Sequence, residues 1–413
     1  MLDIAVTMSN SVQSQIRDTI KRKGKITFAE FMGLALFSKQ GGYYYSNKNS
    51  GQRDYFTSPL SHPVFGALIS IQLKEVWDFM GKPRQFPIIE LGAGSGVLSR
   101  DIVRFISKNE PKFFESIRYF SVDYQPSSDP FSGINFFKSD SHPFQDITGC
   151  IISNELLDSF PVHRFIRDGS GFKEVYVDLD GDDFVEIIDE ISTSDIENRL
   201  SGYGIEEGLH GEVNLKMYDW SKSLSNILKQ GLILTVDYGD IAESLYTGGR
   251  KYGTLNCYYD HMIIDNPYEN IGDQDITAHV DFSALMTLGE NDGLRTAGFT
   301  TQKKFLRNLG FQKFVSALSR SDIDQTTMDA NRYGMMELVK TGHMGDFKVL
   351  GQTKGLGDRV FSGFEDFPQE SGRISQKVDP VFLSSEHLNL MSGRYPHLTG
   401  QMEYLWPFDK LTE

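Results

Sequence analysis

The stretch that most constrains this chain runs from Phe86 to Lys108 and reads FPIIELGAGSGVLSRDIVRFISK. The short apolar run Pro87 to Leu91 predicts a buried strand with Glu90 at its carboxyl end. Three glycines follow at every second position, and apolar residues then recur with a helical period, at Leu98, Ile102 and Phe105. A strand, a glycine turn and a helix form the first half of a βαβ unit, whose turn lets the backbone approach a nucleotide-like ligand closely.

The spacing of Gly92, Gly94 and Gly96 distinguishes between classes of ligand. Dinucleotide-binding enzymes use G-x-G-x-x-G, in which the third glycine lies five residues after the first. Here the third glycine lies at four, and Val97 occupies the fifth position. An acidic strand end followed by G-x-G-x-G looks like the first motif of class I S-adenosylmethionine (SAM) methyltransferases. A dinucleotide site and a turn that binds nothing remain the alternatives.

Length and composition restrict the class of protein. A chain of 413 residues suits one large elaborated domain or two smaller ones. The net charge of -15 argues against a general nucleic-acid binder, although an acidic pocket would attract a basic substrate. Cys150 and Cys257 are the only cysteines and lie far apart, so we expect neither a disulfide framework nor a metal site.

Targeting signals are also read from the sequence. No run of eighteen apolar residues occurs, so we expect no membrane span. The first residues, MLDIAVTMSN, contain Asp3 and no arginine, unlike a secretory signal or an arginine-rich transit peptide. We therefore expect a cytoplasmic protein. The net charge argues against nucleic-acid partners, and the chain could form a homodimer.

Acidic residues follow two further predicted strands. Tyr119 to Val122 predicts the second strand, with Asp123 at its end. Ligands of a doubly wound sheet lie beyond the carboxyl ends of its strands, where a carboxylate can accept hydrogen bonds from both ribose hydroxyls. A turn aspartate before Pro126 is the alternative. Asp140 ends another apolar run and could reach the adenine amino group.

A third group follows the fourth predicted strand, Gly149 to Ser153. Asn154, Glu155 and Asp158 come off the end of this central strand. Two carboxylates three residues apart on a helical turn lie on one face, where they can hold a guanidinium in bidentate geometry. The same residues could instead cap the turn.

The candidates for substrate contacts lie around the fifth strand and in two irregular segments. Residues 38 to 59 contain three consecutive tyrosines, which could line the substrate or form a packed flap. Residues 240 to 298 follow the fifth strand and are unusually polar and aromatic. His261 or His279 could be a general base there, because an unperturbed imidazole titrates near neutral pH, or a structural residue. The expected substrate contacts are Tyr43, Asp237, Tyr238, His261, Asp275 and Asp281.

Together these patterns predict an α/β protein with a Rossmann-like class I methyltransferase sheet. The expected division is a helical cap with an aromatic loop (1–80), a SAM-binding α/β core (81–239), a substrate-pocket insert (240–298), the end of the core (299–354) and a C-terminal extension (355–413). The composition shifts at Gly351, and the extension is either an arm docked on the body or a partly ordered tail.

Nine segments, in one order over residues 26 to 354, resemble the MidA family of bacterial and mitochondrial class I methyltransferases. They are ITFAEFMGLALFSKQGGYYY, RDYFTSPLSHPVFG, IIELGAGSGVLSRDI, SNELLDSFPVHRF, LTVDYG, GTL, DQDITAHVDFSAL, TQKKFLRNLG and MGDFKVL. The mitochondrial member of that family is an assembly factor of respiratory complex I that methylates an arginine of a core subunit. The chain departs from the family at Ala93, Ser95 and Asp123, where the family usually has Pro, Arg and Glu.

The resemblance implies a role for each candidate. It places SAM against the glycine loop and makes Asn154, Glu155 and Asp158 the group beside the transferred methyl. It also implies that the insert builds the acceptor pocket. The expected cofactor-binding residues are Glu90, Gly92, Gly94, Gly96, Asp123, Asp140 and Asn154.

Three functions are compatible with these residues. The leading hypothesis is methyl transfer from SAM to a protein arginine, with Glu155 and Asp158 orienting the guanidinium. Arginine is protonated in water, so a proton must leave during or after transfer, and a carboxylate or His279 could receive it. The alternatives are a small-molecule O- or N-methyltransferase and a SAM-binding assembly factor without turnover.

Overall fold

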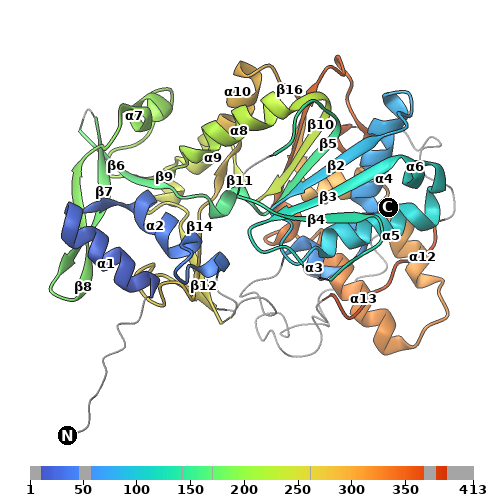
Figure 1. Cartoon of the computed structure of the whole chain (residues 1–413), viewed down its shortest axis with the longest axis horizontal. Helices are drawn as coiled ribbons and strands as arrows, with labels where there is room; N and C mark the ends of the chain where they lie inside the picture. The colour runs from blue at the N-terminus through green and yellow to red at the C-terminus, as the bar shows by residue number, and fades with distance from the viewer. Residues whose placement is uncertain are drawn as a thin grey trace, which may run out of the picture.

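The computed structural model describes residues 11–45, 57–127, 129–140, 143–169, 171–260, 262–366 and 378–387. Seven strands form its main sheet: β2 (Phe86–Leu91), β3 (Ile117–Asp123), β4 (Ile134–Lys138), β5 (Ile147–Asn154), β10 (Leu228–Asp237), β16 (Arg295–Thr301) and β17 (Lys348–Lys354). Their order is β16-β17-β10-β5-β2-β3-β4, with β17 antiparallel to both neighbours and the strands from β10 to β4 parallel (Figure 1). The chain therefore reverses its strand order between β2 and β5, where a parallel sheet opens a crevice for ligands.

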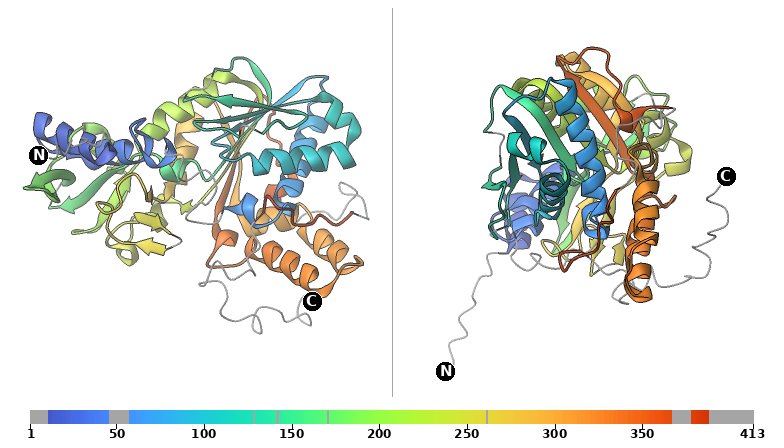
Figure 2. Two further views of the ribbon diagram at one scale, coloured as in Figure 1. Left: turned by 60° about the horizontal axis from the view of Figure 1, so that its bottom comes forward. Right: turned by 90° about the vertical axis from the view of Figure 1, so that its right-hand side faces the viewer.

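Helices cover both faces of this sheet because its central strands are apolar on both sides. Ile88 and Ile89 are adjacent in β2 and lie in two different core clusters. The first cluster is covered by α4 (Val64–Phe79), α5 (Val97–Asn109), α6 (Pro111–Ser116), α11 (Gln302–Asn308), α12 (Phe311–Ser319) and α13 (Gln325–Glu337). The second is covered by α8 (Lys216–Ile227) and α10 (Phe282–Asn291), so the sheet lies between two helical layers (Figure 2).

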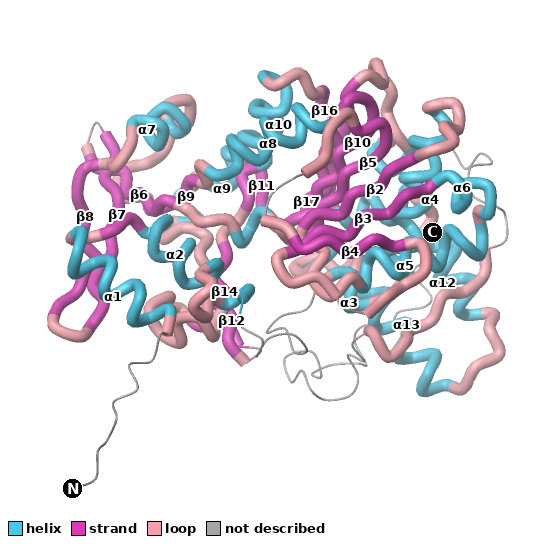
Figure 3. The backbone as a smooth tube through the Cα atoms, in the orientation of Figure 1, coloured by secondary structure: helices cyan, strands magenta, loops and turns pink. Residues whose placement is uncertain are grey.

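A second lobe is built around a smaller sheet, which is the other dense group of strands in Figure 3. Its strands are β1 (Ile26–Thr27), β6 (His163–Asp168), β7 (Gly171–Asp180), β8 (Asp183–Glu190) and β9 (His210–Val213). The N-terminal residues supply β1, which pairs with β7, so α1 (Val12–Lys23) and α2 (Phe28–Phe37) pack on this sheet. The sequence predicts a place in the core for residues 163–213, but they lie in this second lobe, because β6 pairs with β7 and β9 whereas β5 pairs with β2 and β10.

The insert contributes to the second lobe. Its three-stranded sheet consists of β12 (Asn256–Tyr259), β13 (Met262–Ile264) and β14 (Asp275–Thr277). Cys257 and Ile276 from this sheet lie in one apolar cluster with α1 and α2. The shorter elements are α3 (Ser58–Ser61), α7 (Ser194–Leu200), α9 (Ala242–Leu245), β11 (Gly239–Asp240), β15 (Val280–Asp281), η1 (Tyr43–Tyr45), η3 (Leu157–Ser159), η4 (Gly248–Arg250), η5 (Met344–Asp346) and η6 (Ser362–Phe364).

Residues 378–387 of the C-terminal extension are docked on α5. His387 Nε2 lies 2.9 Å from Asp101 Oδ2, and both side chains are almost fully buried. Glu386 pairs with Arg100 and Arg104 of the same helix. For these residues the extension is an arm that packs on the body of the protein.

We expect His387→Ala to lower the free energy of unfolding by about 3 kcal/mol, because Asp101 would lose a buried polar partner. Burial already raises the pKa of Asp101, so this carboxyl depends on its partner. Urea denaturation would measure the change. Asp379→Asn is the control, because its partner Lys108 is exposed and such pairs contribute about 0.5 kcal/mol. Equal effects of the two substitutions would contradict this account of the arm.

Candidate active site

The glycine loop between β2 and α5 adopts a backbone that favours glycine at each of its three glycines. Gly92, Gly94 and Gly96 have φ angles of +69°, +54° and +76°, in the left-handed region. A Cβ atom on Gly92 would also lie 2.7 Å from Cδ1 of Leu156. Backbone conformation and packing both therefore require glycine where the loop meets the segment after β5.

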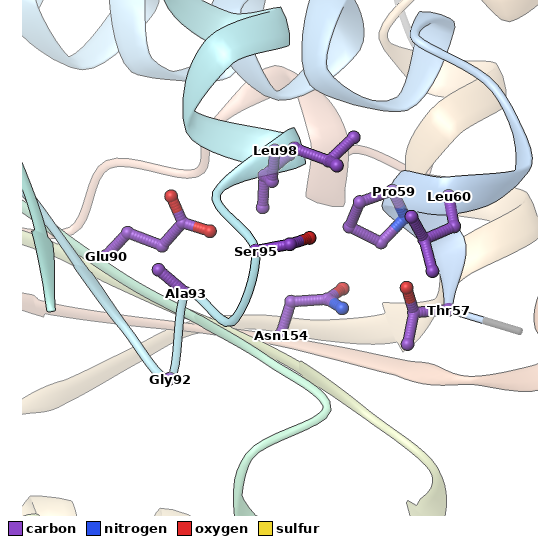
Figure 4. A pocket seen from close by; sticks show the side chains of 10 residues that line it. Thr57, Pro59, Leu60, Glu90, Gly92, Ala93, Ser95, Leu98 and Asn154 are labelled. Atoms are coloured by element: carbon purple, nitrogen blue, oxygen red, sulfur yellow. The ribbon is translucent and has the colours of Figure 1, made fainter. Parts of the chain in front are cut away.

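A pocket opens directly above this loop and encloses about 340 Å³, its open mouth included. Figure 4 shows Thr57, Pro59 and Leu60 on the side of the pocket opposite Glu90, with the loop between them. The described residues that line it are Thr57, Pro59, Leu60, Glu90, Gly92, Ala93, Ser95, Val97, Leu98 and Asn154.

Two polar side chains in the pocket are suited to a cationic ligand. Glu90 Oε2 accepts a hydrogen bond of 2.8 Å from the Tyr119 hydroxyl, and burial raises the pKa of Glu90 to about 8. Asn154 Oδ1 is buried and has no hydrogen-bond partner among the described residues, while its Nδ2 donates to Glu155. An acceptor without a donor in such a pocket fits the ammonium group that SAM carries.

Asp123 connects the glycine loop to the next strand end. Its Oδ2 accepts a hydrogen bond of 2.8 Å from the Gly94 N–H, and its Oδ1 accepts one of 2.8 Å from the Gln125 N–H. Asp140 is exposed beyond β4, close enough to Tyr124 for its charge to contribute to the raised pKa of that phenol, after burial and Tyr45. Both predicted carboxylates therefore lie at the edge of the sheet that carries the loop.

Glu155 holds an unusual backbone conformation at the end of β5. Its φ angle is +49°, which is costly for a residue with a side chain. The Glu155 N–H donates to the Val236 carbonyl at 2.8 Å, and Oε1 accepts from the Ser58 N–H at 3.0 Å. The turn therefore places the Glu155 carboxylate between the end of the sheet and α3.

Two more carboxyl groups and a phenol are buried next to Glu155. Burial raises the pKa of Asp237, and the charges of Asp158 and Glu155 raise it further. The Asp237 oxygens accept hydrogen bonds from the N–H groups of Leu156, Leu157 and Tyr238. Burial raises the pKa of Asp158 to about 6, and the nearby Tyr238 hydroxyl lowers it in part.

Asp158 differs from Asp237 in how its oxygens are satisfied. Both of its carboxylate oxygens are buried, and within the described chain neither meets a hydrogen-bond donor in good geometry. The group Glu155, Asp158, Asp237 and Tyr238 is called the carboxylate cluster below. Within this cluster, the two Asp158 oxygens are acceptor atoms that the described residues leave unused.

The other predicted substrate contacts have different surroundings. Tyr43 is buried in the apolar core of the second lobe, as in the packed alternative. Its neighbour Tyr44 donates to both oxygens of Asp275 at 3.0 Å. Asp281 caps α10 through the Ala284 N–H and pairs with Arg199 at 2.5 Å, which joins α10 to α7. His261 lies outside the described residues.

His279 lies beside the carboxylate cluster but is poorly suited to be a general base. Its ring lies 5.8 Å from the Tyr238 ring. Its Nδ1 accepts a hydrogen bond of 2.9 Å from Arg250 Nη1. Burial and the Arg250 charge lower the pKa of His279 to about 4. Nδ1 therefore already accepts a hydrogen bond, and the low pKa means that the ring is mostly unprotonated at neutral pH.

The sequence patterns did not predict that α3 and the residue before it line the pocket. Thr57, Pro59 and Leu60 line it, and the Ser58 N–H holds Glu155. The only available signal was the motif TSPL, which lies within a segment that resembles the MidA family. No cluster of side chains that could hold a metal ion occurs in the described residues, and no described helix has the length and apolar character to span a bilayer.

Comparison with known proteins identifies the family. A family profile described as S-adenosyl-L-methionine-dependent methyltransferase matches residues 68–300, more than half of the chain. The chain belongs to the MidA family of methyltransferases. It is therefore a SAM-dependent methyltransferase, and SAM is its cofactor. The pocket agrees with this assignment, because the three glycines and the free Asn154 oxygen fit that ligand.

Curated relatives of this MidA-family chain are named as protein arginine methyltransferases NDUFAF7, mitochondrial. The protein from Danio rerio is 26% identical over 76% of this chain and 80% of its own length, and the one from Homo sapiens is 25% identical over 79% of each. The crystal structure of a protein from Burkholderia thailandensis, bound to S-adenosyl-homocysteine, matches with a TM-score of 0.76 at 24% identity, over 87% of this chain and 95% of that protein. This likeness confirms the predicted class I fold.

The comparison corrects one prediction about this MidA-family member. The sequence predicted a cytoplasmic protein, but the curated relatives are named as mitochondrial proteins. The prediction of a cytoplasmic location is therefore wrong. It relied on the composition of the first residues, which is a weak signal without a comparison.

We expect SAM binding by this chain to tighten as the pH rises from neutral towards about 8 and to level off above that value. Glu90 has its pKa raised to about 8 by burial, so at neutral pH the carboxyl is largely protonated. A cationic ligand favours the ionised form, so binding at neutral pH should release a proton. Calorimetry of SAM binding in two buffers of different ionisation enthalpy would count that proton. Glu90→Gln should remove both the release and the pH dependence, and proton release by this variant would contradict the assignment.

Proposed function

We propose that this methyltransferase transfers the methyl group of SAM to an arginine of a polypeptide. The observation that carries the proposal is the buried carboxylate of Asp158, whose two oxygens have no hydrogen-bond donor in good geometry among the described residues. A guanidinium presents two parallel N–H donors and a positive charge, which matches such a carboxylate. A neutral hydroxyl acceptor would leave one oxygen and the charge unsatisfied.

The relatives support the same acceptor. Those cited above are named as protein arginine methyltransferases and match about four fifths of their own length. The second carboxylate, Glu155, is half-buried and directly follows the pocket residue Asn154 in the sequence. Its Oε1 accepts a hydrogen bond from the Ser58 N–H. Two carboxylates around one guanidinium would fix its plane and leave one nitrogen toward the pocket.

The chemistry then needs alignment and a proton acceptor. SAM supplies a methyl group on a sulfonium, and the bond from sulfur to that carbon breaks as the bond from the arginine nitrogen forms. The electron pair of the broken bond stays on sulfur, and the nitrogen loses one proton. Alignment of the reacting atoms can remove several kcal/mol of the barrier, on the order of 7 in favourable cases.

Glu155 and Asp158 are the groups that would receive this proton. The pKa of Asp158 is about 6, so the carboxylate is ionised at neutral pH yet basic enough to share a proton. His279 would be a weaker acceptor, because burial and Arg250 lower its pKa to about 4. We therefore assign proton transfer to the carboxylates and a positioning role to His279.

The test is methyl transfer in a lysate of cells that lack this chain. Purified protein and SAM with a labelled methyl group are added, and label is followed separately in protein and in small molecules. We expect label in a protein band that yields methylated arginine after acid hydrolysis. Label confined to a small extractable product would replace the proposal with a metabolite methyltransferase. SAM binding without any label would indicate an assembly factor without turnover.

A further inference from the structure

The three-stranded sheet of the insert presents an exposed strand edge. β13 pairs with β12 on one side, and among the described residues no strand pairs with its other side. The side chains of Met262 and Ile263 in this strand are 61% and 64% exposed. A sheet edge of this kind, with apolar side chains, is a place where a second polypeptide can add a strand.

This sheet is attached to the carboxylate cluster at its other side. The Ala278 N–H, just after β14, donates to the Asp158 carbonyl at 2.9 Å. Tyr258 of β12 is near enough to Asp158 and Glu155 for their charges, after burial, to help raise its pKa to about 12. The hairpin of β12 and β13 therefore borders the proposed acceptor site.

The register between the two strands places Ile263 on the same face as Tyr258. Tyr258 lies opposite Ile263, and Tyr259 lies opposite Met262. Opposed residues of an antiparallel pair share a face, and successive residues alternate between faces. Ile263 is thus next to the phenol that borders the carboxylate cluster, while Met262 is on the other face.

We propose that β13 docks the polypeptide that carries the acceptor arginine, with an apolar side chain of that polypeptide on Ile263. This inference rests on the proposed arginine methylation. Charge complementarity favours this occupant: exposed Asp265 follows β13, the adjoining cluster is acidic, and the chain carries a net charge of -15. A segment with an arginine and apolar neighbours complements both features, whereas a small acceptor would leave the strand edge unused.

Four variants test the docking face in the labelled lysate described above. Ile263→Ser removes the apolar contact, and Ile263→Val keeps most of it. Met262→Ser changes the same strand on its other face. Ile188→Ser, at a side chain of β8 that is 60% exposed, controls for loss of an exposed isoleucine elsewhere in the second lobe. We expect Ile263→Ser to lower the initial rate of protein labelling at least about tenfold, with the dissociation constant for S-adenosyl-homocysteine unchanged.

The outcomes separate this inference from the proposed function. The docking role is supported if Ile263→Val, Met262→Ser and Ile188→Ser label the protein at nearly the wild-type rate and a higher lysate concentration restores the rate of Ile263→Ser. Normal labelling by Ile263→Ser would overturn the docking role and leave arginine methylation standing. Equal losses in all serine variants would also overturn it. If the wild-type protein labels no polypeptide, both proposals fail before any variant is compared.

Discussion

Asp158→Asn should abolish most methyl transfer while leaving SAM binding intact. Asparagine keeps the shape of the side chain but removes the charge and replaces one acceptor oxygen with a donor. A guanidinium would then face an N–H group in a buried site, and breaking a buried ion pair costs about 3 to 5 kcal/mol. We expect kcat/KM for the protein acceptor to fall by about a hundredfold or more. Initial rates with labelled SAM, and calorimetry with S-adenosyl-homocysteine, would separate the two effects.

The pH profile gives this prediction an independent readout. The pKa of Asp158 is raised to about 6, so the active ionised form is lost as the pH falls below that value. We expect kcat/KM of the wild-type protein to decrease on the acid side of about pH 6, since a protonated Asp158 cannot pair with the guanidinium. The asparagine variant should lose this inflection. If the asparagine variant keeps the wild-type turnover, or the same decrease in kcat/KM below about pH 6, Asp158 does not bind the acceptor.

Gly92→Ala should weaken SAM binding by at least about tenfold. The substitution places a side chain at a φ angle of +69° and brings its Cβ atom within 2.7 Å of Leu156 Cδ1. The left-handed backbone alone costs about 1 kcal/mol or more for alanine, and the contact forces the loop or Leu156 to move. Because the same loop lines the cofactor pocket, the movement should reach SAM. Calorimetric titration with SAM would measure it.

A second glycine provides the matched control. Gly342 has a φ angle of +80°, but a Cβ atom there would have no neighbour within 4 Å. Gly342→Ala should therefore lower stability by about 1 kcal/mol and leave SAM affinity unchanged. The double variant Gly92→Ala, Leu156→Ala should recover part of the lost affinity, because it makes room for the new methyl group. Equal losses in both single variants would indicate general destabilisation instead of a local clash.

The core of the fold could be predicted from sequence because its signals are local. A five-residue apolar run, a glycine turn and a helical period lie within one stretch from Phe86 to Lys108. Parallel strands then bring distant strand ends to one edge, which is why Asp123 and Asn154 were expected together and are found near the same loop. The same argument predicts that Glu155 and Asp158, which follow β5, lie near this edge of the sheet.

The rest depends on contacts between segments that are far apart in sequence. Nothing near Ile26 indicates that it pairs with Val177, so the second lobe could not be assembled from the pattern alone. His279 has the residue type of a general base, but Arg250, in a separate turn, occupies its Nδ1. Asp281, a predicted substrate contact, caps α10 in the structure, and a carboxylate before an apolar helical run can serve either role.

The position of β17 has a consequence for biosynthesis. This strand is the last of the main sheet to be made, yet it lies between β10 and β16, and within the described part of the chain β16 pairs with no other strand. Until Lys354 has left the ribosome, one edge of β10 is unpaired and β16 lacks its strand partner. A nascent or prematurely terminated chain would expose that edge to chaperones, proteases or other copies of itself. Quality control of this enzyme should therefore discriminate sharply between chains that end before and after this strand.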